Sequence, residues 1–451
     1  MQEYSPGRVA LWTGISADDI VKLARQYATT SPAAIRLNYG IQRSDNGGMA
    51  VRAVCMLPCL IGAWKQVGGG LQLSTGEGHN LNKDALKGTE LMPRPTRVIN
   101  MVELGRALNE VNDPPVQALF VYNSNPAAVA PNHNSVVRGL LRTDLFTVVH
   151  EQFFTDTTDY ADIILPATTF FEHKDLQTGY GHYYIQISNQ AIEPLGECRS
   201  NVELFRALAL RMGFDDACFR ESVDDMIDLA LSSDHPHLAG IDRARLQRES
   251  HLRLNLPEPS MDVILSEPAP GLRGRVEGPL PGTRFYLPFA HGFPTRTGKA
   301  LLYNEELVAQ GLDPVASFTP PRESRHGGDA RYPLELLARK CDNYLNSTFA
   351  NLPPQQKMEN PDLLEISAAD AQARGIADGD CVRVFNSRGE ILLTARVNGA
   401  TRPGVVAARL NWAKLTGQAR NINVLTSERL TDMGGGGTFY SVLVEVARAA
   451  L

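Results

Sequence analysis

Three short apolar runs lie close together in the chain, at residues 116–122, 145–149 and 163–167. Polar or turn-forming residues bound each run, a pattern typical of strands that are buried on both faces of a parallel sheet. A helix-like segment at residues 135–141 separates the first two runs. The order of strand, helix, strand and a further strand therefore predicts an α/β unit in the middle of the chain.

A polar loop follows each of these predicted strands. In an open α/β sheet, ligands bind beyond the carboxyl ends of the strands. Amide, hydroxyl, imidazole and carboxylate groups in such loops can hydrogen-bond a ribose, a purine edge or a diphosphate. The alternative is that they are only turn and cap residues. The candidate side chains are those of Asn123, Ser124, Asn125, His150, Glu151 and His173.

The upstream part of the chain repeats the order of strand, polar loop and helix. Residues 8–28 predict a helix with Ser16 as a plausible N-cap, and residues 33–37 predict a strand. A polar loop then leads to a helix start at residues 46–48, which is a usual place for an anion to bind. Pro58 predicts a kink or a break in that helix.

The pattern changes again after the central unit. An amphipathic helix is predicted at 202–212, with Ser200 or Asn201 as its cap, and residues 215–330 predict irregular loops and a linker. The three histidines of that stretch lack the spacing of metal ligands. Short strands predict a β-rich domain from Tyr332 onward. These strands are expected at residues 334–338, 363–366, 380–385, 390–397, 405–410 and 441–446.

Composition narrows the classes of partner. The chain has 451 residues, a net charge of −6 and no long basic run, which argues against a nucleic-acid partner. No apolar run is long enough for a membrane span, and the first residues do not resemble a signal peptide. The six cysteines are scattered without a C-x-x-C pair, so no zinc or iron–sulfur frame is visible. Buried free thiols suit a reducing compartment, so a cytoplasmic location is expected.

Several motifs resemble the molybdopterin oxidoreductase family, which includes dimethyl sulfoxide reductase, nitrate reductase and formate dehydrogenase. In the central unit they are YNSNP, VVHEQFFTDTTDYADIILPATTFFEHKD and EPLGECRSNVELFRALALRMG. In the β-rich part they are ARKCDNYLNSTFANL, ARLNW and NINVLTSERLTDMGGGGTFY. The resemblance covers nearly the whole chain and is weakest from about Cys218 to Gly328.

The resemblance implies an α/β fold, with a partial parallel-sheet, Rossmann-like cofactor domain followed by a C-terminal six-stranded β-barrel of the double-psi type. Residues 1–72 would end a pterin-binding domain begun upstream, and residues 73–215 would form the domain that binds the dinucleotide tail. Residues 216–330 would be an irregular extension and linker. Residues 331–451 would form the β-barrel that binds molybdopterin dinucleotide.

The family's cofactor is a molybdenum or tungsten ion held by two pterin guanine dinucleotides, a long anionic ligand that needs many hydrogen bonds. His173 stands where the family often has Lys, and an imidazole is a weaker cation at pH 7. For Arg43 the alternative is a surface ion pair, and for Asn201 it is helix capping. By resemblance, the cofactor-binding residues are Tyr39, Gln42, Arg43, Asn123, Ser124, Asn125, His150, Glu151, His173, Asn201, Lys340, Asn346, Ser347, Thr348, Trp412, Asn423, Phe439 and Tyr440.

Two parts of the family pattern have no counterpart here. A C-x-x-C-type segment that binds a [4Fe–4S] cluster is expected only upstream, and so is the residue that ligates the metal. The chain is therefore expected to be the C-terminal part of an oxidoreductase, transferring an oxygen atom or a hydride equivalent when complete and inactive alone. Its expected partners are the upstream half or an electron-transfer subunit. A twin-arginine signal upstream would make the location periplasmic instead.

The alternative is a non-catalytic module that binds a pterin or a guanine nucleotide, or a subunit that completes a split enzyme. Either reading predicts a large exposed apolar face, with self-association or poor solubility as the consequence.

Overall fold

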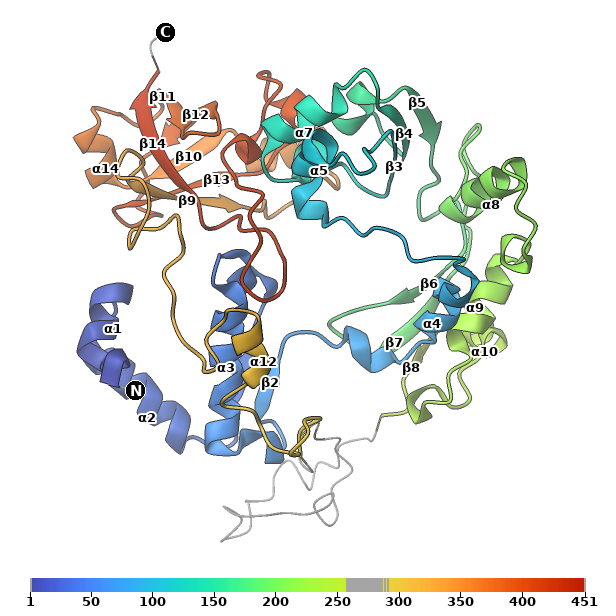
Figure 1. Ribbon diagram of the computed structural model, residues 1–451, viewed down its shortest axis with the longest axis horizontal. Helices are drawn as coiled ribbons and strands as arrows, with labels where there is room; N and C mark the ends of the chain where they lie inside the picture. The colour runs from blue at the N-terminus through green and yellow to red at the C-terminus, as the bar shows by residue number, and fades with distance from the viewer. Residues whose placement is uncertain (1, 257–286, 288, 290–291, 450–451) are drawn as a thin grey trace.

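The computed structural model describes residues 2–256, 287, 289 and 292–449 (Figure 1). Their strands form a two-stranded sheet, two three-stranded sheets and a closed six-stranded barrel. This confirms the predicted class of α/β parts with parallel sheets followed by a six-stranded β-barrel. The predicted domain boundaries stay predictions, and residues 257–286, 288 and 290–291 of the predicted extension lie outside the described residues. No described helix is both long and apolar enough to cross a bilayer.

The first part of the chain contains two helices where the sequence predicted one. Gly14 ends the first helix with φ of 71°, a left-handed conformation that glycine adopts without strain. Ser16 Oγ accepts a hydrogen bond from the backbone N–H of Asp19 at 3.1 Å, which confirms it as the N-cap of the second helix. Pro58 does not end the third helix, which continues to Ile61. The elements are α1 (Pro6–Thr13), α2 (Ala17–Thr29), β1 (Ala34–Arg36), α3 (Gly47–Ile61) and β2 (Gly70–Gln72), and β1 and β2 pair in parallel.

The three strands predicted in the middle of the chain form one parallel sheet, in the order β3–β4–β5. Only β4 is buried along most of its length. In β5, Ile163 and Ile164 are 44% and 40% exposed. The prediction that all three runs are buried on both faces is therefore wrong for the outer strands, which have a neighbour on one side only. The elements are α5 (Leu104–Glu110), β3 (Ala118–Tyr122), α7 (His133–Leu140), β4 (Phe146–Glu151) and β5 (Ile163–Pro166).

The stretch after this sheet is more regular than the sequence predicted. Three antiparallel strands form a separate sheet, and helices pack against it so that Ile185 and Leu246 are fully buried. The prediction of irregular chain is wrong for residues 223–253, because Ile227, Leu231 and Leu246 meet this sheet and form a core with it. The elements are β6 (Asp175–Thr178), β7 (Tyr184–Ser188), α8 (Asn201–Arg211), α9 (Val223–Leu231), α10 (Arg243–Glu249) and β8 (His251–Arg253).

The C-terminal part is the closed barrel, in the strand order β10–β12–β11–β14–β9–β13. Its core is the largest apolar cluster of the described residues, and Leu336, Leu364 and Val382 are completely buried in it. The sequence predicted all six strands to within a few residues. They are β9 (Leu334–Arg339), β10 (Leu363–Ile366), β11 (Cys381–Phe385), β12 (Glu390–Arg396), β13 (Val405–Arg409) and β14 (Leu443–Arg448).

The barrel lies beside the central parallel sheet (Figure 1). The side-chain amides of Asn421 and Asn423 each donate to the carbonyl oxygen of Ala128 at 2.9 Å, and all three residues are buried. The backbone N–H of Lys414 donates to Asp156 Oδ1 at 2.8 Å. These contacts hold the barrel against the segments that follow β3 and β4, where the sequence placed candidate residues.

Candidate functional site

A cavity of about 730 Å³ opens where the start of α3, the strand β3 and the barrel meet. Its apolar wall includes residues of β3, and its polar groups come mainly from the barrel and from the turn before α3. Eight residues that the sequence predicted as cofactor-binding line it. They are Gln42, Arg43, Ser124, Lys340, Asn346, Asn423, Phe439 and Tyr440.

Three cationic residues line this cavity. Arg339 is paired with Asp342 and Glu365, whereas Arg43 and Lys340 are not paired in this way within the described part of the chain. The guanidinium of Arg43 lies over the ring of Phe439, 5.4 Å from its centroid. Burial lowers the pKa of Lys340, and the nearby charge of Arg43 lowers it further. Among the described residues, neither side chain forms an ion pair with a carboxylate. Like charges placed together without a counter-ion favour an anionic ligand.

A buried carboxylate holds the loop that follows Lys340. Glu359 is 4% exposed and accepts hydrogen bonds from the backbone N–H of Asp342 at 2.8 Å and from Asn343 Nδ2 at 2.6 Å. Burial acts to raise the pKa of Glu359, but the hydrogen bond from the backbone N–H of Asn343, together with the two just named, outweighs it and keeps the pKa below its usual range. The charged carboxylate thereby fixes the loop that carries Asn346, whose φ of 54° is left-handed.

A glycine-rich loop, residues 430–440, forms another wall of the cavity. The backbone N–H of Thr431 donates to the carbonyl of Gly436 at 2.8 Å, and Thr431 Oγ1 accepts from the N–H of Gly436 at 3.0 Å. Asn100 Nδ2 donates to the carbonyl of Gly435 at 2.8 Å. The loop is therefore tied at both its base and its tip.

The start of α3 is occupied by a side chain of the protein. Asp432 accepts hydrogen bonds from the backbone N–H groups of Gly48 and Met49 at 2.8 and 3.0 Å. A carboxylate at this end complements the helix dipole. The expectation that an external anion binds at this helix start is therefore wrong, because Asp432 already satisfies the free N–H groups.

A second cavity, of about 430 Å³, lies at the carboxyl ends of the central strands. Asn123, His173 and Asn201 line it, as the sequence predicted for a ligand at this edge. His173 Nδ1 is 2.8 Å from Thr168 Oγ1. Asn201 is the first residue of α8, and Ser200 provides the helix cap through a capping box with Glu203. The Asn201 side chain is thus not needed for capping.

Sequence reasoning missed several polar residues in this second cavity, among them Gln152, Lys174 and Arg199. Gln152 Nε2 donates to the carbonyl of Thr168 at 3.0 Å. Arg199 reaches the cavity because its backbone pairs with the end of β5, through an isolated bridge to Ala167. That pairing has no local signature in the sequence. One feature of the sequence could have indicated Arg199 as a binding residue: it lies two residues before Asn201, within one of the quoted motifs.

The remaining predicted residues line neither cavity. Asn125 is buried and accepts hydrogen bonds from the N–H and the hydroxyl of Thr157 at 3.1 and 2.7 Å. It thus braces the loop after β3. Trp412 is also buried, and its indole N–H donates to the carbonyl of Ser347 at 2.9 Å. Thr348 closes the same turn, since its N–H donates to the carbonyl of Leu345 at 2.9 Å.

His150, Glu151 and Tyr39 also lie outside the cavities. His150 is 1% exposed, Nδ1 lies 3.2 Å from the carbonyl oxygen of Leu165, and burial lowers the pKa of the ring. Burial raises the pKa of Glu151, whose Oε1 accepts from the next backbone N–H at 2.7 Å. Tyr39 is exposed, with its ring edge-on to Tyr180. Their contact with a nucleotide stays a prediction.

No group of three or more His, Cys, Asp or Glu side chains that could hold a metal ion occurs in the described part of the chain. The donor groups in both cavities include amides, hydroxyls and cations, which suit an anionic organic ligand, and the second cavity also contains the imidazole of His173 and the carboxylate of Asp175.

Comparisons with known proteins agree with the quoted motifs. The family model described as "Molybdopterin oxidoreductase" matches residues 12–211, and the model "Molydopterin dinucleotide binding domain" matches residues 334–443. The second match contains the barrel residues of the larger cavity, from Lys340 to Tyr440.

Curated relatives match almost the whole chain. The probable oxidoreductase YoaE of Bacillus subtilis is 41% identical over 450 residues, which are 99% of this chain and 61% of that protein. Dimethyl sulfoxide reductase DmsA of Escherichia coli is 28% identical, over 97% of this chain and 56% of that protein. The chain thus spans about three fifths of the length of these relatives.

Among solved structures, acetylene hydratase from Pelobacter acetylenicus superposes with a TM-score of 0.75 at 21% identity. The superposition covers 99% of this chain and 65% of that protein. It confirms the fold, including the mixed six-stranded barrel.

Proposed function

Because the chain belongs to the molybdopterin oxidoreductase family, of the dimethyl sulfoxide reductase type, we propose that its larger cavity binds the pterin guanine dinucleotide cofactor. The observation that carries this proposal is the pair Arg43 and Lys340, two cations that share one cavity without a carboxylate partner among the described residues. A diphosphate supplies the missing negative charge. An arginine can bind it through two parallel N–H bonds, and a lysine as a point charge.

The residues around these cations fit the rest of such a ligand. Asn346 and Ser124 offer hydrogen bonds, while Phe439 and Tyr440 offer flat apolar surface beside the cations. The second cavity fits a nucleoside end, since Asn123, Gln152 and Asn201 carry both donors and acceptors.

The cofactor would supply a molybdenum or tungsten centre that changes oxidation state during the transfer of an oxygen atom or a hydride equivalent. The residues of this chain bind and orient its organic part. The apolar wall that β3 contributes would lower the local dielectric beside a bound ligand and so strengthen the charge interactions there. The relative named dimethyl sulfoxide reductase supports oxygen-atom transfer as the reaction class.

A second candidate function is that of a subunit which completes its binding site with another polypeptide. The observation that favours it is α2, an amphipathic helix with no buried residue, in which Leu23 is 67% exposed. The sheet β1–β2, whose first strand follows α2 in the chain, has only three residues in each strand. Both features suit an interface with another polypeptide.

The test is the cofactor content of the purified chain, produced in cells that make the cofactor. Acid-released pterin fluorescence, guanine nucleotide and molybdenum or tungsten would be measured on the same sample. We expect pterin and guanine nucleotide to be retained and to be lost from the double variant Arg43→Gln/Lys340→Gln. Equal retention by both proteins, or none by the unsubstituted chain, would count against the proposal. Retention only beside a co-purifying chain would favour the second candidate.

A further inference from the structure

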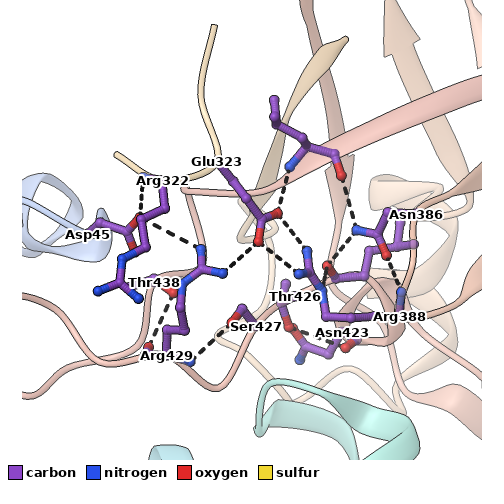
Figure 2. Close-up of polar contacts among 12 residues, drawn as sticks. Asp45, Arg322, Glu323, Asn386, Arg388, Asn423, Thr426, Ser427, Arg429 and Thr438 are labelled. Atoms are coloured by element: carbon purple, nitrogen blue, oxygen red, sulfur yellow. Dashed lines mark hydrogen bonds and ion pairs between the residues drawn. The ribbon is translucent and has the colours of Figure 1, made fainter. Parts of the chain in front are cut away.

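Residues 319–329 return the chain to the barrel and bring Glu323 between two arginines (Figure 2). Arg388 lies in the turn between β11 and β12 and donates to both carboxylate oxygens of Glu323, at 2.8 and 2.7 Å. Arg429 Nη1 donates to Oε1 at 2.8 Å, and the backbone N–H of Leu443 donates to Oε2 at 3.1 Å. One carboxylate therefore joins three separate segments of the barrel to the chain that enters it.

This carboxylate is charged and largely enclosed. The side chain of Glu323 is 16% exposed. Burial acts to raise its pKa, but the hydrogen bonds and charge of Arg388, together with the hydrogen bonds from Leu443 and Arg429, outweigh burial, and the pKa lies below its usual range. Charge-assisted hydrogen bonds of this kind are roughly twice as strong as neutral ones. Removal of the charge would leave Arg388 without its carboxylate partner and Arg429 with only the longer contact to Asp45, at 3.7 Å.

Arg429 extends the cluster toward the turn before α3 (Figure 2). Its Nη2 lies 3.7 Å from Asp45 Oδ2, and the same oxygen accepts from the backbone N–H of Arg322 at 2.7 Å. The N–H of Asp45 donates to Ser441 Oγ at 2.9 Å, and its carbonyl accepts from the N–H of Asp432 at 2.9 Å. The entering chain, the turn before α3 and the barrel loop thus meet at Arg429.

The loop that starts at Arg429 is the glycine-rich wall of the larger cavity, residues 430–440. Thr438 Oγ1 donates to the carbonyl of Arg429 at 3.2 Å, so the two ends of the loop are joined beside the cluster. The N–H of Tyr440 donates to the carbonyl of Arg43 at 3.0 Å. Neither Glu323 nor Arg429 lines the cavity, but the loop between them and the cavity does.

We propose that Glu323 is a positioning residue for the cofactor site: by holding Arg429, it keeps loop 430–440 against the turn that carries Arg43. The ligand in this inference is taken from the proposed function. The statement that Glu323 holds the loop in place does not depend on that function. A simpler possibility is that Glu323 only stabilises the barrel. The two possibilities predict different effects when Glu323 loses one of its two arginine partners. Arg429 directly precedes loop 430–440, whereas Arg388 lies in the turn between β11 and β12.

The experiment compares Glu323→Gln, Arg429→Gln and Arg388→Gln in the full chain. Arg388→Gln also removes a charged partner of Glu323, but it leaves the contact to Arg429. Glu390→Gln, which breaks the exposed Arg383 pair on the same barrel, is the control. Hydrogen exchange would report on the amides of residues 431–437, and calorimetric titration with guanosine diphosphate would report on the site.

We expect Glu323→Gln and Arg429→Gln to speed exchange in the loop about tenfold or more and to weaken binding of guanosine diphosphate about fivefold. Arg388→Gln and Glu390→Gln should leave both readouts close to those of the unsubstituted chain. If Glu323→Gln does not fold, Arg429→Gln alone decides, since it keeps the Arg388 pair.

Loop exchange that changes no more in Arg429→Gln than in Arg388→Gln would overturn the role of Glu323. Absence of guanosine diphosphate binding by the unsubstituted chain would instead count against the proposed function, and the exchange comparison would still decide on Glu323. The two failures are therefore distinguishable.

Discussion

Lys340 and Arg43 illustrate how residues placed to bind a ligand lower the stability of the folded chain when the ligand is absent. Lys340 is exposed overall, but beside Arg43 its ammonium loses part of its hydration and meets the repulsion of the guanidinium, and both effects lower the pKa of Lys340. A group that binds its proton more weakly in the folded state than in the unfolded state destabilises the folded state while it is charged. Lys340 is therefore placed for a ligand and not for stability.

We expect Lys340→Gln to raise the midpoint of thermal unfolding by about 1–3 °C at pH 7 and to weaken binding of guanosine diphosphate. Because the folded-state pKa is lowered, stability rises as the pH increases through that pKa, so the gain over the unsubstituted chain should shrink toward alkaline pH. Scanning calorimetry at pH 7 and at higher pH checks both points. A variant that is less stable at pH 7 would show that Lys340 has a structural partner.

Individual residues were predictable from the sequence where a motif or a polar loop after a predicted strand carried them. Lys340 lies in a quoted motif and Arg43 lies in the loop after the strand at residues 33–37, and the structure brings them into one cavity although they are far apart in the sequence. Arg199 and Glu323 were missed because their positions depend on pairing between distant segments. Asn125 and Trp412 were predicted from motifs as ligand contacts, but the structure shows both in hydrogen bonds within the protein.

At the scale of elements, α3 links the site to the barrel. Its N-terminal N–H groups are satisfied by Asp432, a residue of the glycine-rich loop. Gly47 is needed at the same place, because a Cβ atom there would lie 2.6 Å from the backbone Cα of Gln42. The helix start, the turn that carries Gln42 and the loop therefore form one packed unit.

We expect Asp432→Ala to lower the free energy of unfolding by about 1–2 kcal/mol, since it uncaps α3, and also to weaken guanosine diphosphate binding. Ser16→Ala uncaps α2 and serves as the matched control, since Ser16 lines neither cavity. Urea denaturation and calorimetric titration are the measurements. Equal effects of the two variants on binding would show that the cap does not shape the cavity.

The barrel was the most predictable set of elements. Alternation along β12 places every second residue in the core, and the β11–β12 turn has a clear turn sequence. The strands β1, β2 and β8 have only three residues each, so an alternating pattern of apolar and polar residues is too short to predict them. The helices at 223–249 bury their apolar side against β7, a contact that local pattern does not reveal.

At the scale of the whole molecule, much apolar surface is exposed on the helices of the first part. Leu11 of α1, Leu23 of α2 and Leu60 of α3 are 83%, 67% and 66% exposed. Neither α1 nor α2 contains a buried residue. Large exposed apolar side chains, where they form a continuous patch, mark interaction sites or lead to association.

We expect the purified chain to self-associate as its concentration rises, and sulfate to strengthen the association because it favours burial of apolar surface. Sedimentation velocity over a range of concentrations measures this. The pair Leu23→Lys and Leu60→Lys should reduce association, whereas Leu195→Lys, at a leucine 79% exposed outside these helices, should not. A single monomeric species under all conditions would contradict the expectation.

Binding of an anionic nucleotide by the paired cations is the claim on which the rest depends. The most direct measurement is calorimetric titration of the full chain with guanosine diphosphate, in parallel with Arg43→Gln/Lys340→Gln and with the exposed-cation control Arg383→Gln. We predict saturable binding by the unsubstituted chain and the control, and a loss of affinity of about tenfold or more in the double variant. Binding of equal strength in all three proteins, or no binding by the unsubstituted chain, would contradict it.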